Sequence, residues 1–453
     1  MIAGKYKEFY DKLKSIIPEK RMLHDPLSTL AFGTDASFYR LIPKLVIKAH
    51  GEEEIVAILT TAYNMGLPVT FRAAGTSLSG QAISDSILVL ATHGWKEHKI
   101  LDHGLKICLQ PGIRGAAANR YLAPYGRKIG PDPASIDAAM IGGIAANNAS
   151  GMCCGVADNS YKTVADIRII IPDGTLLDTA DEASVRSFKE SHKELLSSLE
   201  RISSDIRSNT ELKERIIRKY KIKNTNGYSL NAFTDYSEGI DILKHLIIGS
   251  EGTLAFISSI TYNTVIEHPH KALAMVVFTS IKDACTAAHI LKGKKATAVE
   301  LIDRTGVRSA DQTPGIPEYL KTIGEESCVL LIEARGASAE ELKANVESLR
   351  ASISHLPTEL PYTFTTDAKE QAMLWKIRKE LFPTVAGLRK SGTTPIIEDI
   401  CFPIEKLAEA TVKLREIFER NGYADAVIFG HAMDGNLHFV FNQNFSKDEE
   451  VEK

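Results

Sequence analysis

Three observations from the sequence predict an α+β protein of at least two domains. The chain has 453 residues, more than one hydrophobic core usually serves. Strand and helix patterns alternate through the first half, which also holds three glycine-rich segments. From residue 272 the predicted order becomes strand, helix, strand, strand, helix, strand, which is typical of a ferredoxin-like module. We place the domain boundary within residues 268–271.

Composition excludes several classes of protein. With 54 basic and 57 acidic residues the chain lacks the basic surplus of nucleic-acid-binding proteins. No apolar run approaches the roughly 20 residues that a membrane helix needs, and residues 1–21 form an amphipathic helix pattern without a signal-peptide core. The six cysteines contain no CxxC pair that would frame a zinc or iron–sulfur site. We expect a cytoplasmic protein without a transmembrane segment; peripheral contact with a membrane stays open.

The first glycine-rich segment ends a strand–helix–strand unit. Residues 45–49 (LVIKA) have the pattern of a buried strand. Residues 52–65 follow as a helix with one apolar face, and the next strand ends at Phe71. The loop 72–80 (RAAGTSLSG) then loses side-chain bulk and gains hydroxyls. Consecutive N–H groups in such a turn can form a concave site for phosphate oxygens.

Two better-known phosphate motifs are excluded at this loop. The GxxxxG spacing of Gly75 and Gly80 is followed by Gln81 and Ala82 instead of Lys and Ser or Thr, so it is no P-loop. The chain also has no GxGxxG between a strand and a helix, so a Rossmann site lacks support. The loop is either a phosphate cradle of another kind or an ordinary glycine-containing loop.

Two further segments are rich in small residues. Within 130–155, Gly142 and Gly143 interrupt a helical pattern at a cost of about 1 kcal/mol each relative to Ala. Close approach to a flat or extended ligand would explain them, and so would tight packing against another helix. The third segment, IIGSEGTLAFI at 247–257, is predicted as a strand-like run.

The remaining elements follow from periodicity and turn residues. In the first half, strands are predicted at 87–91, 105–110 and 163–171, with helical patterns at 114–123 and 182–221. In the second half, strands are predicted at 272–278, 297–302, 328–334, 361–365 and 395–402, and helices at 281–292, 338–354, 367–389 and 403–420.

The last predicted element is a hairpin that carries two histidines. Asp434–Gly435 is a strong two-residue turn signal between AVIFGH and NLHFVF. That turn would place His431 directly opposite His438, with Cβ atoms about 4.5 to 5.5 Å apart. Two imidazoles so placed could bind one zinc-like ion, with nitrogens at about 2.1 Å. The alternative is a stacked pair of uncharged histidines in a packed sheet.

Five motifs, in this order, resemble the FAD-linked oxidases of the vanillyl-alcohol-oxidase type: RAAGTSLSGQ, GPDPASI with IGGIAANNASG, IIGSEGTL, WKIR and GHAMDGNLHF. The resemblance covers roughly residues 30–442 and is closest to D-2-hydroxy-acid dehydrogenases. It implies an N-terminal helical segment (1–30), a two-part PCMH-type FAD-binding domain (31–270) and a ferredoxin-like cap, or substrate, domain (271–453).

The resemblance implies FAD as the cofactor. Some relatives attach FAD covalently through a His in the first loop; Thr76 and Ser77 stand there in this chain, so we expect non-covalent FAD. The residues that the resemblance assigns to FAD are Arg72, Ala73, Ala74, Gly75, Thr76, Ser77, Leu78, Gly80, Gln81, Pro131, Asp132, Ser135, Ile136, Gly142, Gly143, Ala146, Asn148, Ser150, Gly151, Glu251, Gly252 and Ile257.

The resemblance also implies a substrate site on the cap domain. Arg378 would hold the substrate carboxylate, with Asn436 as a further catalytic residue. His431 and His438 would bind a divalent metal such as zinc, or one of them would act as general base. As a charge on a substrate-facing helix, Arg378 is expected to contribute little to the core. The alternative for Arg378 is a surface ion pair with Glu370 or Glu380 on its own helix.

The third metal ligand of these relatives is a Glu in a later EHG motif, which this chain does not contain. Glu398 or Asp399 is a candidate replacement. The other explanation is that the chain is a piece of a longer protein, truncated at its C-terminus. Relatives often continue into a cysteine-rich domain that binds a cluster.

The implied reaction is FAD-dependent oxidation of a D-2-hydroxy acid, D-lactate to pyruvate, with electrons passed to an iron–sulfur domain, a quinone or a cytochrome rather than to NAD. D-2-hydroxyglutarate and glycolate are the alternative substrates. Relatives specific for D-2-hydroxyglutarate carry a Lys where this chain has Ile397, which favours the smaller acid. A different class of function is a flavin-binding module without turnover.

Overall fold

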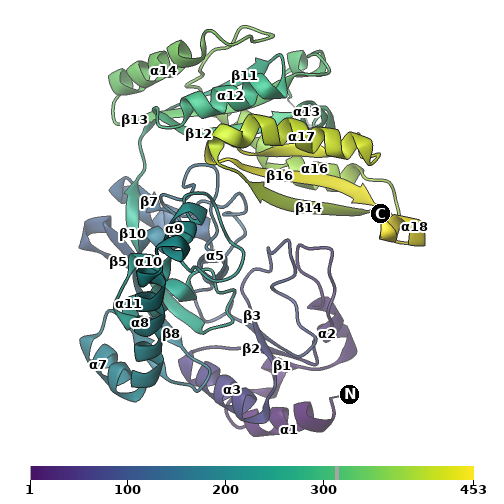
Figure 1. Cartoon of the computed structure of the whole chain (residues 1–453). Coiled ribbons are helices and arrows are strands. Elements are labelled where there is room, and N and C mark those ends of the chain that lie inside the picture. The colour runs from purple at the N-terminus through teal and green to yellow at the C-terminus, as the bar shows by residue number, and fades with distance from the viewer. Residues whose placement is uncertain (1, 312–315) are drawn as a thin grey trace. The chain divides into compact units, whose positions relative to one another are not determined.

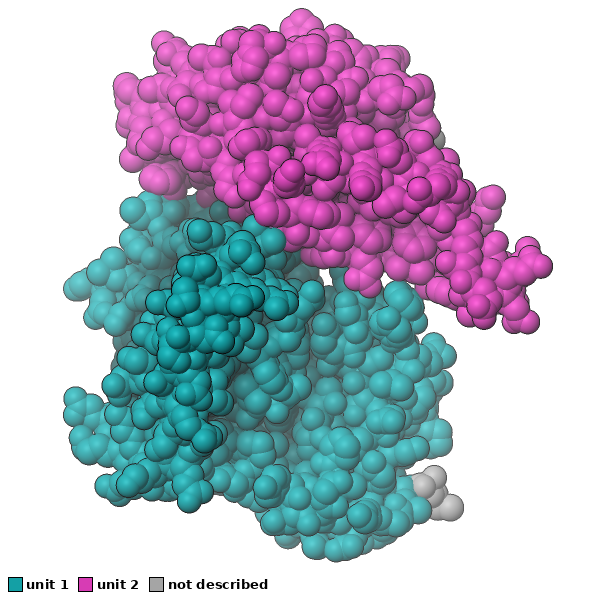
Figure 2. All heavy atoms as spheres, viewed as in Figure 1, with its two compact units in different colours: residues 1–267 teal, residues 268–453 magenta. Residues whose placement is uncertain are grey.

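The computed structural model describes residues 2–311 and 316–453 (Figure 1). The chain forms two compact units, residues 1–267 (unit 1) and 268–453 (unit 2), which Figure 2 distinguishes by colour. No described helix is both long and apolar enough to cross a lipid bilayer.

The first sheet of unit 1 has the order β1-β2-β4-β3, with β2, β4 and β3 parallel and β1 antiparallel to β2. The helix α3 covers residues 52–65, as the sequence predicts, and Gly66 directly after it has the left-handed conformation. The N-terminal helix α1 shares its core, through Phe9 and Leu13. The elements are α1 Gly4–Leu13, β1 Met22–Leu23, α2 Pro26–Ala31, β2 Leu45–Lys48, α3 Glu52–Met65, β3 Val69–Arg72 and β4 Ile87–Leu90.

The second sheet of unit 1 is antiparallel, in the order β5-β6-β10-β8-β9 with β7 also paired to β10. The predicted strand-like run at 247–257 is wrong at its start. Helix α11 ends at Ile247 and β10 begins at Phe256, because Gly249 and Gly252 take positive φ and form a turn. The elements are β5 His98–Leu101, β6 Lys106–Leu109, α4 Gly115–Leu122, β7 Arg127–Ile129, α5 Ile141–Asn147, α6 Ser160–Thr163, β8 Val164–Ile170, β9 Leu176–Asp178, α7 Glu182–Ser191, α8 Lys193–Ser208, α9 Thr210–Lys219, α10 Ala232–Asp235, α11 Gly239–Ile247 and β10 Phe256–Ile266.

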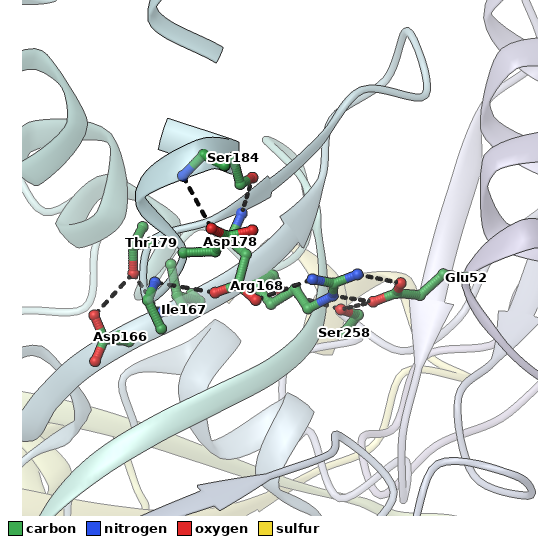
Figure 3. Close-up of polar contacts among 11 residues, drawn as sticks. Glu52, Asp166, Ile167, Arg168, Asp178, Thr179, Ser184 and Ser258 are labelled. Atoms are coloured by element: carbon green, nitrogen blue, oxygen red, sulfur yellow. Dashed lines mark hydrogen bonds and ion pairs between the residues drawn. The ribbon is translucent and has the colours of Figure 1, made fainter. Parts of the chain in front are cut away.

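A set of ion pairs and hydrogen bonds joins helix α3 to the second sheet of unit 1 (Figure 3). Arg168 on β8 binds the carboxylate of Glu52, at the start of α3, through two nitrogens at 2.7 and 2.8 Å. The same guanidinium reaches Asp178 on β9 at 2.9 Å, and Ser258 on β10 donates to Glu52 at 2.6 Å. Hydrogen bonds to this half-buried carboxylate therefore fix α3 against the second sheet.

Unit 2 is a six-stranded sheet covered by helices on both faces, in the order β11-β13-β12-β15-β16-β14. Helices α12, α14 and α17 pack on one face, and α13, α15 and α16 on the other. The elements are β11 His270–Phe278, α12 Ile281–Leu291, β12 Ala296–Asp303, α13 Arg304–Ser309, β13 Cys328–Gly336, α14 Ala339–Ile353, α15 Ala368–Lys379, α16 Leu381–Leu388, β14 Thr394–Cys401, α17 Leu407–Arg420, β15 Val427–His431, β16 Asn436–Gln443 and α18 Asp448–Glu452.

Two predicted elements of unit 2 differ in the structure. The fourth ferredoxin-like strand, expected at 361–365, is reduced to isolated bridges that Thr358 and Thr365 make with β11. Pro361 lies between them and has no N–H group for a continuous ladder. The single helix expected at 367–389 is two helices, α15 and α16, which meet at Glu380.

The register of the closing hairpin also differs from the prediction. A short 3-10 turn at Ala432–Asp434 followed by Gly435 joins the strands, so His431 pairs with Asn436 and His438 pairs with Phe429. His431 and His438 are therefore diagonal neighbours. The shift is two residues, and a strand alternates with period two, so both histidines stay on one face.

Candidate functional site

A row of polar side chains crosses four neighbouring strands of unit 2, on the face that α15 covers. Glu300 on β12 is the register partner of His431 on β15, and Asp399 on β14 is the register partner of His438 on β16. Because β12, β15, β16 and β14 are consecutive in the sheet, the order across it is carboxylate, imidazole, imidazole, carboxylate. The residues around this row on the same face are largely apolar.

Each imidazole is oriented by a carboxylate at its Nδ1 atom. His431 Nδ1 lies 2.7 Å from Glu300 Oε1, and His438 Nδ1 is hydrogen-bonded to Asp399 Oδ1. The two Nε2 atoms face each other at 3.4 Å, with the ring planes at 89°, so the rings are not stacked. A carboxylate at Nδ1 keeps the proton on that nitrogen and leaves the lone pair on Nε2, where it can bind a proton or a metal ion.

The spacing of the imidazoles fits two ligands of a metal ion, but the third ligand is missing. Two nitrogens at about 2.1 Å from one tetrahedral ion lie about 3.4 Å apart, which is the separation of the Nε2 atoms. In the described part of the chain, no group of three or more His, Cys, Asp or Glu side chains could hold a metal ion. Asp399 faces Nδ1 of His438, and Glu398 pairs with Phe439 on the opposite face, so neither replaces the missing ligand.

Arg378 lies on α15 beside this row and is only 3 % exposed. Its Nε donates to Glu300 Oε2 at 2.8 Å, and Nη2 lies 2.7 Å from the same oxygen without the angle of a hydrogen bond. The guanidinium carbon lies 4.8 Å from the centre of the Phe429 ring. The alternative of a surface ion pair with Glu370 or Glu380 is wrong, and so is the expectation that Arg378 adds little to the core.

Two further residues complete the cap site. Glu300 is fully buried; burial raises the pKa of its carboxyl, but the interactions with His431 and Arg378 together outweigh burial and hold that pKa below its usual value. Glu300 was not predicted from the sequence, although an acid within the apolar stretch AVELI (298–302) was a usable signal. Asn436, also buried, donates from Nδ2 to the Ile400 carbonyl at 3.2 Å and so ties β16 to β14.

In unit 1, the loop 72–80 follows β3 and presents unpaired backbone N–H groups. Within residues 2–311 and 316–453, the N–H groups of Gly75, Thr76, Ser77 and Leu78 have no acceptor, whereas those of Ser79 and Gln81 donate to Ser77 Oγ at 3.2 Å. Residues 73–78 are half-buried. Consecutive N–H groups without acceptors can form a site for an anion.

The side chain of Arg72 packs against the backbone of this loop. Its Nη1 donates to the Thr34 carbonyl at 2.7 Å. Gly75 has φ +72°, and a Cβ there would lie 2.5 Å from Arg72 Nη2, so the loop closes over the guanidinium. Gly80 (φ +79°) packs against Tyr39. Arg72 therefore shapes the loop through main-chain contacts, while Ala73 and Ala74 keep it free of bulk.

The two glycines of α5 have different surroundings. A Cβ at Gly142 would lie 2.7 Å from Pro111, which matches the alternative of tight packing. A Cβ at Gly143 would meet only Ala73 of the loop 72–80, at 3.9 Å, and Gly143 is exposed. Of these two glycines, only Gly143 therefore faces open space, beside Ala73 of the loop 72–80.

Most other predicted residues of the segment 130–151 make hydrogen bonds or close contacts that hold the local backbone in place. Asp132 accepts hydrogen bonds from the Cys153 and Cys154 N–H groups, and its carbonyl leaves no room for a Cβ at Gly151. Asn148, left-handed at the end of α5, accepts from the Tyr161 N–H. The other predicted residues here are Pro131, buried before the turn, Ser135 and Ile136 within the turn, Ala146 at the end of α5, and Ser150, which lines a cavity of about 30 Å³.

The turn at 248–253 docks on the end of α5. The Glu251 N–H donates to the Ala146 carbonyl at 2.9 Å, and its carboxylate accepts from Asn147 Nδ2 at 2.6 Å. Asn147 was not among the predicted site residues. Gly252 lies beside Phe71 of β3, whereas Ile257 belongs to the buried core between β10 and β8.

The chain matches two protein families. Residues 43–180 match the FAD binding domain, and residues 267–453 match the FAD linked oxidases, C-terminal domain. The second match contains Glu300, Arg378 and both histidines, and the first contains the loop 72–80.

Known relatives resemble the chain over nearly its whole length. It is 25 % identical to the mitochondrial D-lactate dehydrogenase (cytochrome) of Arabidopsis thaliana, covering 99 % of this chain and 70 % of that protein. It is 24 % identical to D-2-hydroxyglutarate dehydrogenase of Pantoea ananatis, covering 90 % of this chain but only 42 % of that protein. The structure of p-cresol methylhydroxylase with substrate bound superposes with a TM-score of 0.68 at 12 % identity, covering 99 % of this chain and 85 % of that one. The predicted α+β, PCMH-type fold is thereby confirmed.

Proposed function

Because the chain belongs to the FAD linked oxidases, we propose that it oxidises a D-2-hydroxy acid to the 2-oxo acid and passes the electrons to an acceptor other than NAD. D-lactate is the substrate that we favour. The observation that carries this proposal is the cap site, where a buried Arg378 adjoins two imidazoles whose Nε2 atoms face each other at 3.4 Å.

Oxidation of a 2-hydroxy acid needs a group that binds the carboxylate and a group that accepts the hydroxyl proton. Of the five N–H bonds of Arg378, only Nε–H has a hydrogen-bond acceptor among the described residues; the buried Nη2 lies 2.7 Å from Glu300 Oε2 as an ion pair but donates no well-aligned hydrogen bond. A buried donor without an acceptor is costly, and a substrate carboxylate would satisfy it through two parallel bonds. When no metal ion is bound, an Nε2 lone pair of the histidine pair would accept the hydroxyl proton.

The residues of unit 1 fit FAD. The four N–H groups at 75–78 suit its pyrophosphate, and the open side of α5 at Gly143 suits its flat or extended part. FAD, when bound, supplies the acceptor for the α-hydrogen and its two electrons. The loop offers Thr76 and Ser77 and no histidine, so the FAD would be released by acid precipitation; flavin left in the pellet would contradict this.

A divalent ion such as zinc is the second part of the proposal. His431 and His438 would hold it, and the ion would lower the pKa of the substrate hydroxyl when bound. With two protein ligands its affinity would be low, so a chelator should remove it readily. The electron acceptor, whether an iron–sulfur domain, a quinone or a cytochrome, and a cytoplasmic location stay predictions.

D-2-hydroxyglutarate is the second candidate substrate, and one observation weighs against it. Ile397 lies on the same face of β14 as Asp399, two residues away, and packs into the apolar cluster there. An apolar side chain offers no partner for a second substrate carboxylate. The smaller acids therefore fit this side of the site better.

Anaerobic bleaching of the flavin tests the proposed function. The FAD-loaded protein is mixed with D-lactate, L-lactate, glycolate or D-2-hydroxyglutarate, each with and without EDTA. D-lactate should bleach the flavin fastest, L-lactate should not, and EDTA should slow the reaction. If none of these acids bleaches the flavin, the oxidase proposal is wrong. If D-lactate bleaches the flavin rapidly and EDTA does not slow the reaction, the proposed role of the metal ion is wrong, while the oxidase proposal stands.

A further inference from the structure

We propose that Glu300 is a positioning residue for this reaction: one oxygen of its carboxylate orients His431 and the other orients Arg378. The inference rests on the proposed function of the cap site and adds a role for a residue that neither binds nor reacts with the substrate itself. Glu300 would thereby fix the distance between the group that accepts the proton and the group that holds the carboxylate.

The division of contacts between the two oxygens supports this role. Oε1 lies 2.7 Å from His431 Nδ1, while Oε2 lies 2.8 Å from Arg378 Nε and 2.7 Å from Nη2. The three residues come from β12, β15 and α15, so this one carboxylate joins three elements. All three side chains are at least nine-tenths buried, which limits alternative rotamers and competing water.

Each contact also selects a chemical state of its partner. A carboxylate at Nδ1 keeps the proton there, so His431 Nε2 carries its lone pair toward His438. On the arginine, Glu300 Oε2 contacts the edge formed by Nε and Nη2, so the N–H groups of Nη1 are left without an acceptor among the described residues. The substrate carboxylate would thus contact Arg378 and the substrate hydroxyl would contact His431, and Glu300 orients both of these side chains.

A purely structural role explains the same charge poorly. The neighbours of Glu300 along β12, Val299, Leu301 and Ile302, are all buried and apolar. Burying an ion pair often stabilises a fold no more than an apolar side chain of similar volume would. The carboxylate is therefore better explained by the orientation of its two partners than by stability.

The test compares Glu300→Gln with Glu333→Gln. Glu333 lies in the same sheet, is 3 % exposed and pairs with Arg335 at 2.6 Å, so its variant controls for the loss of a buried carboxylate bonded to arginine. Binding of D-lactate and of zinc ions alone is measured by calorimetry, together with kcat, KM and FAD affinity. We expect Glu300→Gln to weaken both D-lactate and zinc binding by about 10- to 100-fold and to raise KM, with FAD affinity unchanged. Glu333→Gln should leave all of these at the wild-type values.

In Glu300→Gln, Arg378 is buried without a counter-charge, which could prevent folding. A double variant keeps the inference testable in that case. Arg378→Met is compared with Glu300→Gln/Arg378→Met, in which both charges are gone. If Glu300 orients His431, the double variant binds zinc about tenfold or more weakly than Arg378→Met. Equal zinc affinities, or wild-type D-lactate and zinc binding by Glu300→Gln, would overturn the role while leaving the oxidase intact. A wild-type protein that binds neither D-lactate nor zinc would overturn the proposed function and, with it, this role.

Discussion

His245 on α11 illustrates what burial does to a single titratable side chain. The imidazole is 3 % exposed, its ring centre lies 3.9 Å from that of Tyr236, and its Nδ1 lies 2.7 Å from the Asp241 carbonyl. Burial lowers its pKa from 6.5 to about 4, because the charged form loses its hydration. His245 is therefore neutral in the folded protein at any pH near 7.

We predict that His245 makes unit 1 sensitive to acid. Between pH 6.5 and 4 the unfolded chain binds a proton at His245 that the folded chain does not, so the free energy of unfolding falls as pH falls. The loss should reach about 3 kcal/mol near pH 4. Urea unfolding of flavin-free protein at pH 7.0 and pH 4.0 measures it. His245→Asn, which does not titrate, should lose less stability over this range; parallel losses in both proteins would contradict the prediction.

At the scale of elements, helix α5 contains two adjacent glycines with different roles. Gly142 lets the helix pack against Pro111, whereas Gly143 faces open space beside the loop 72–80. The two residues are adjacent in sequence, so their different surroundings arise only from the rotation of about 100° per residue along the helix. Alanine substitution can therefore distinguish a packing glycine from a ligand-facing one.

We predict opposite effects for the two substitutions. Gly142→Ala should destabilise the flavin-free protein by about 1 to 3 kcal/mol, because the new Cβ overlaps Pro111. Gly143→Ala should stabilise it by up to about 1 kcal/mol through helix propensity, yet weaken FAD binding by about tenfold. Urea unfolding and titration with FAD measure the two quantities. Unchanged FAD affinity in Gly143→Ala would show that FAD does not lie on this side of α5.

The loop 72–80 permits a similar comparison, because Gly75 and Gly66 both have positive φ. A Cβ at Gly75 would displace the Arg72 guanidinium, whereas a Cβ at Gly66 would meet nothing within 4 Å. We predict that Gly75→Ala and Gly66→Ala share a backbone cost of about 1 to 2 kcal/mol, but that only Gly75→Ala weakens FAD binding, by about tenfold or more. Equal FAD affinities in the two variants would argue against a role of this loop in holding the cofactor.

At the scale of the whole molecule, each unit has hydrophobic cores and proposed site residues of its own. The predicted FAD residues all lie in unit 1, and Glu300, Arg378 and the histidines lie in unit 2. The sequence contains two tryptophans, Trp95 in unit 1 and Trp375 in unit 2. Each unit therefore has its own fluorescent reporter.

We predict that FAD stabilises unit 1 more than unit 2. In Trp375→Phe, the unfolding transition reported by Trp95 should gain about 2.7 kcal/mol at an FAD concentration 100 times Kd. In Trp95→Phe, the transition reported by Trp375 should shift less with FAD. Fluorescence-monitored urea unfolding of both variants measures this. One shared transition that moves equally in both variants would show that the units unfold together.

The sequence by itself determined the chemistry available along the chain. A loop without bulk, a turn signal at Asp434–Gly435 and the alternation of strands are local properties, so the loop 72–80 and the common face of His431 and His438 could be predicted. The hairpin register was wrong by two residues, and the prediction of a shared face survived because side chains alternate with the same period.

Only the tertiary structure decided which groups meet. Glu300 contacts a histidine 131 positions away and an arginine 78 positions away, and no local pattern of sequence encodes such distances. The same holds for Gly142 and Gly143, which look alike in sequence and differ only in what packs against them. Hydrogen bonds and close contacts depend on positions in space, which the chain acquires when strands from distant segments pair and helices cover them; the sequence alone therefore predicted the parts of the site but not the carboxylate that joins them.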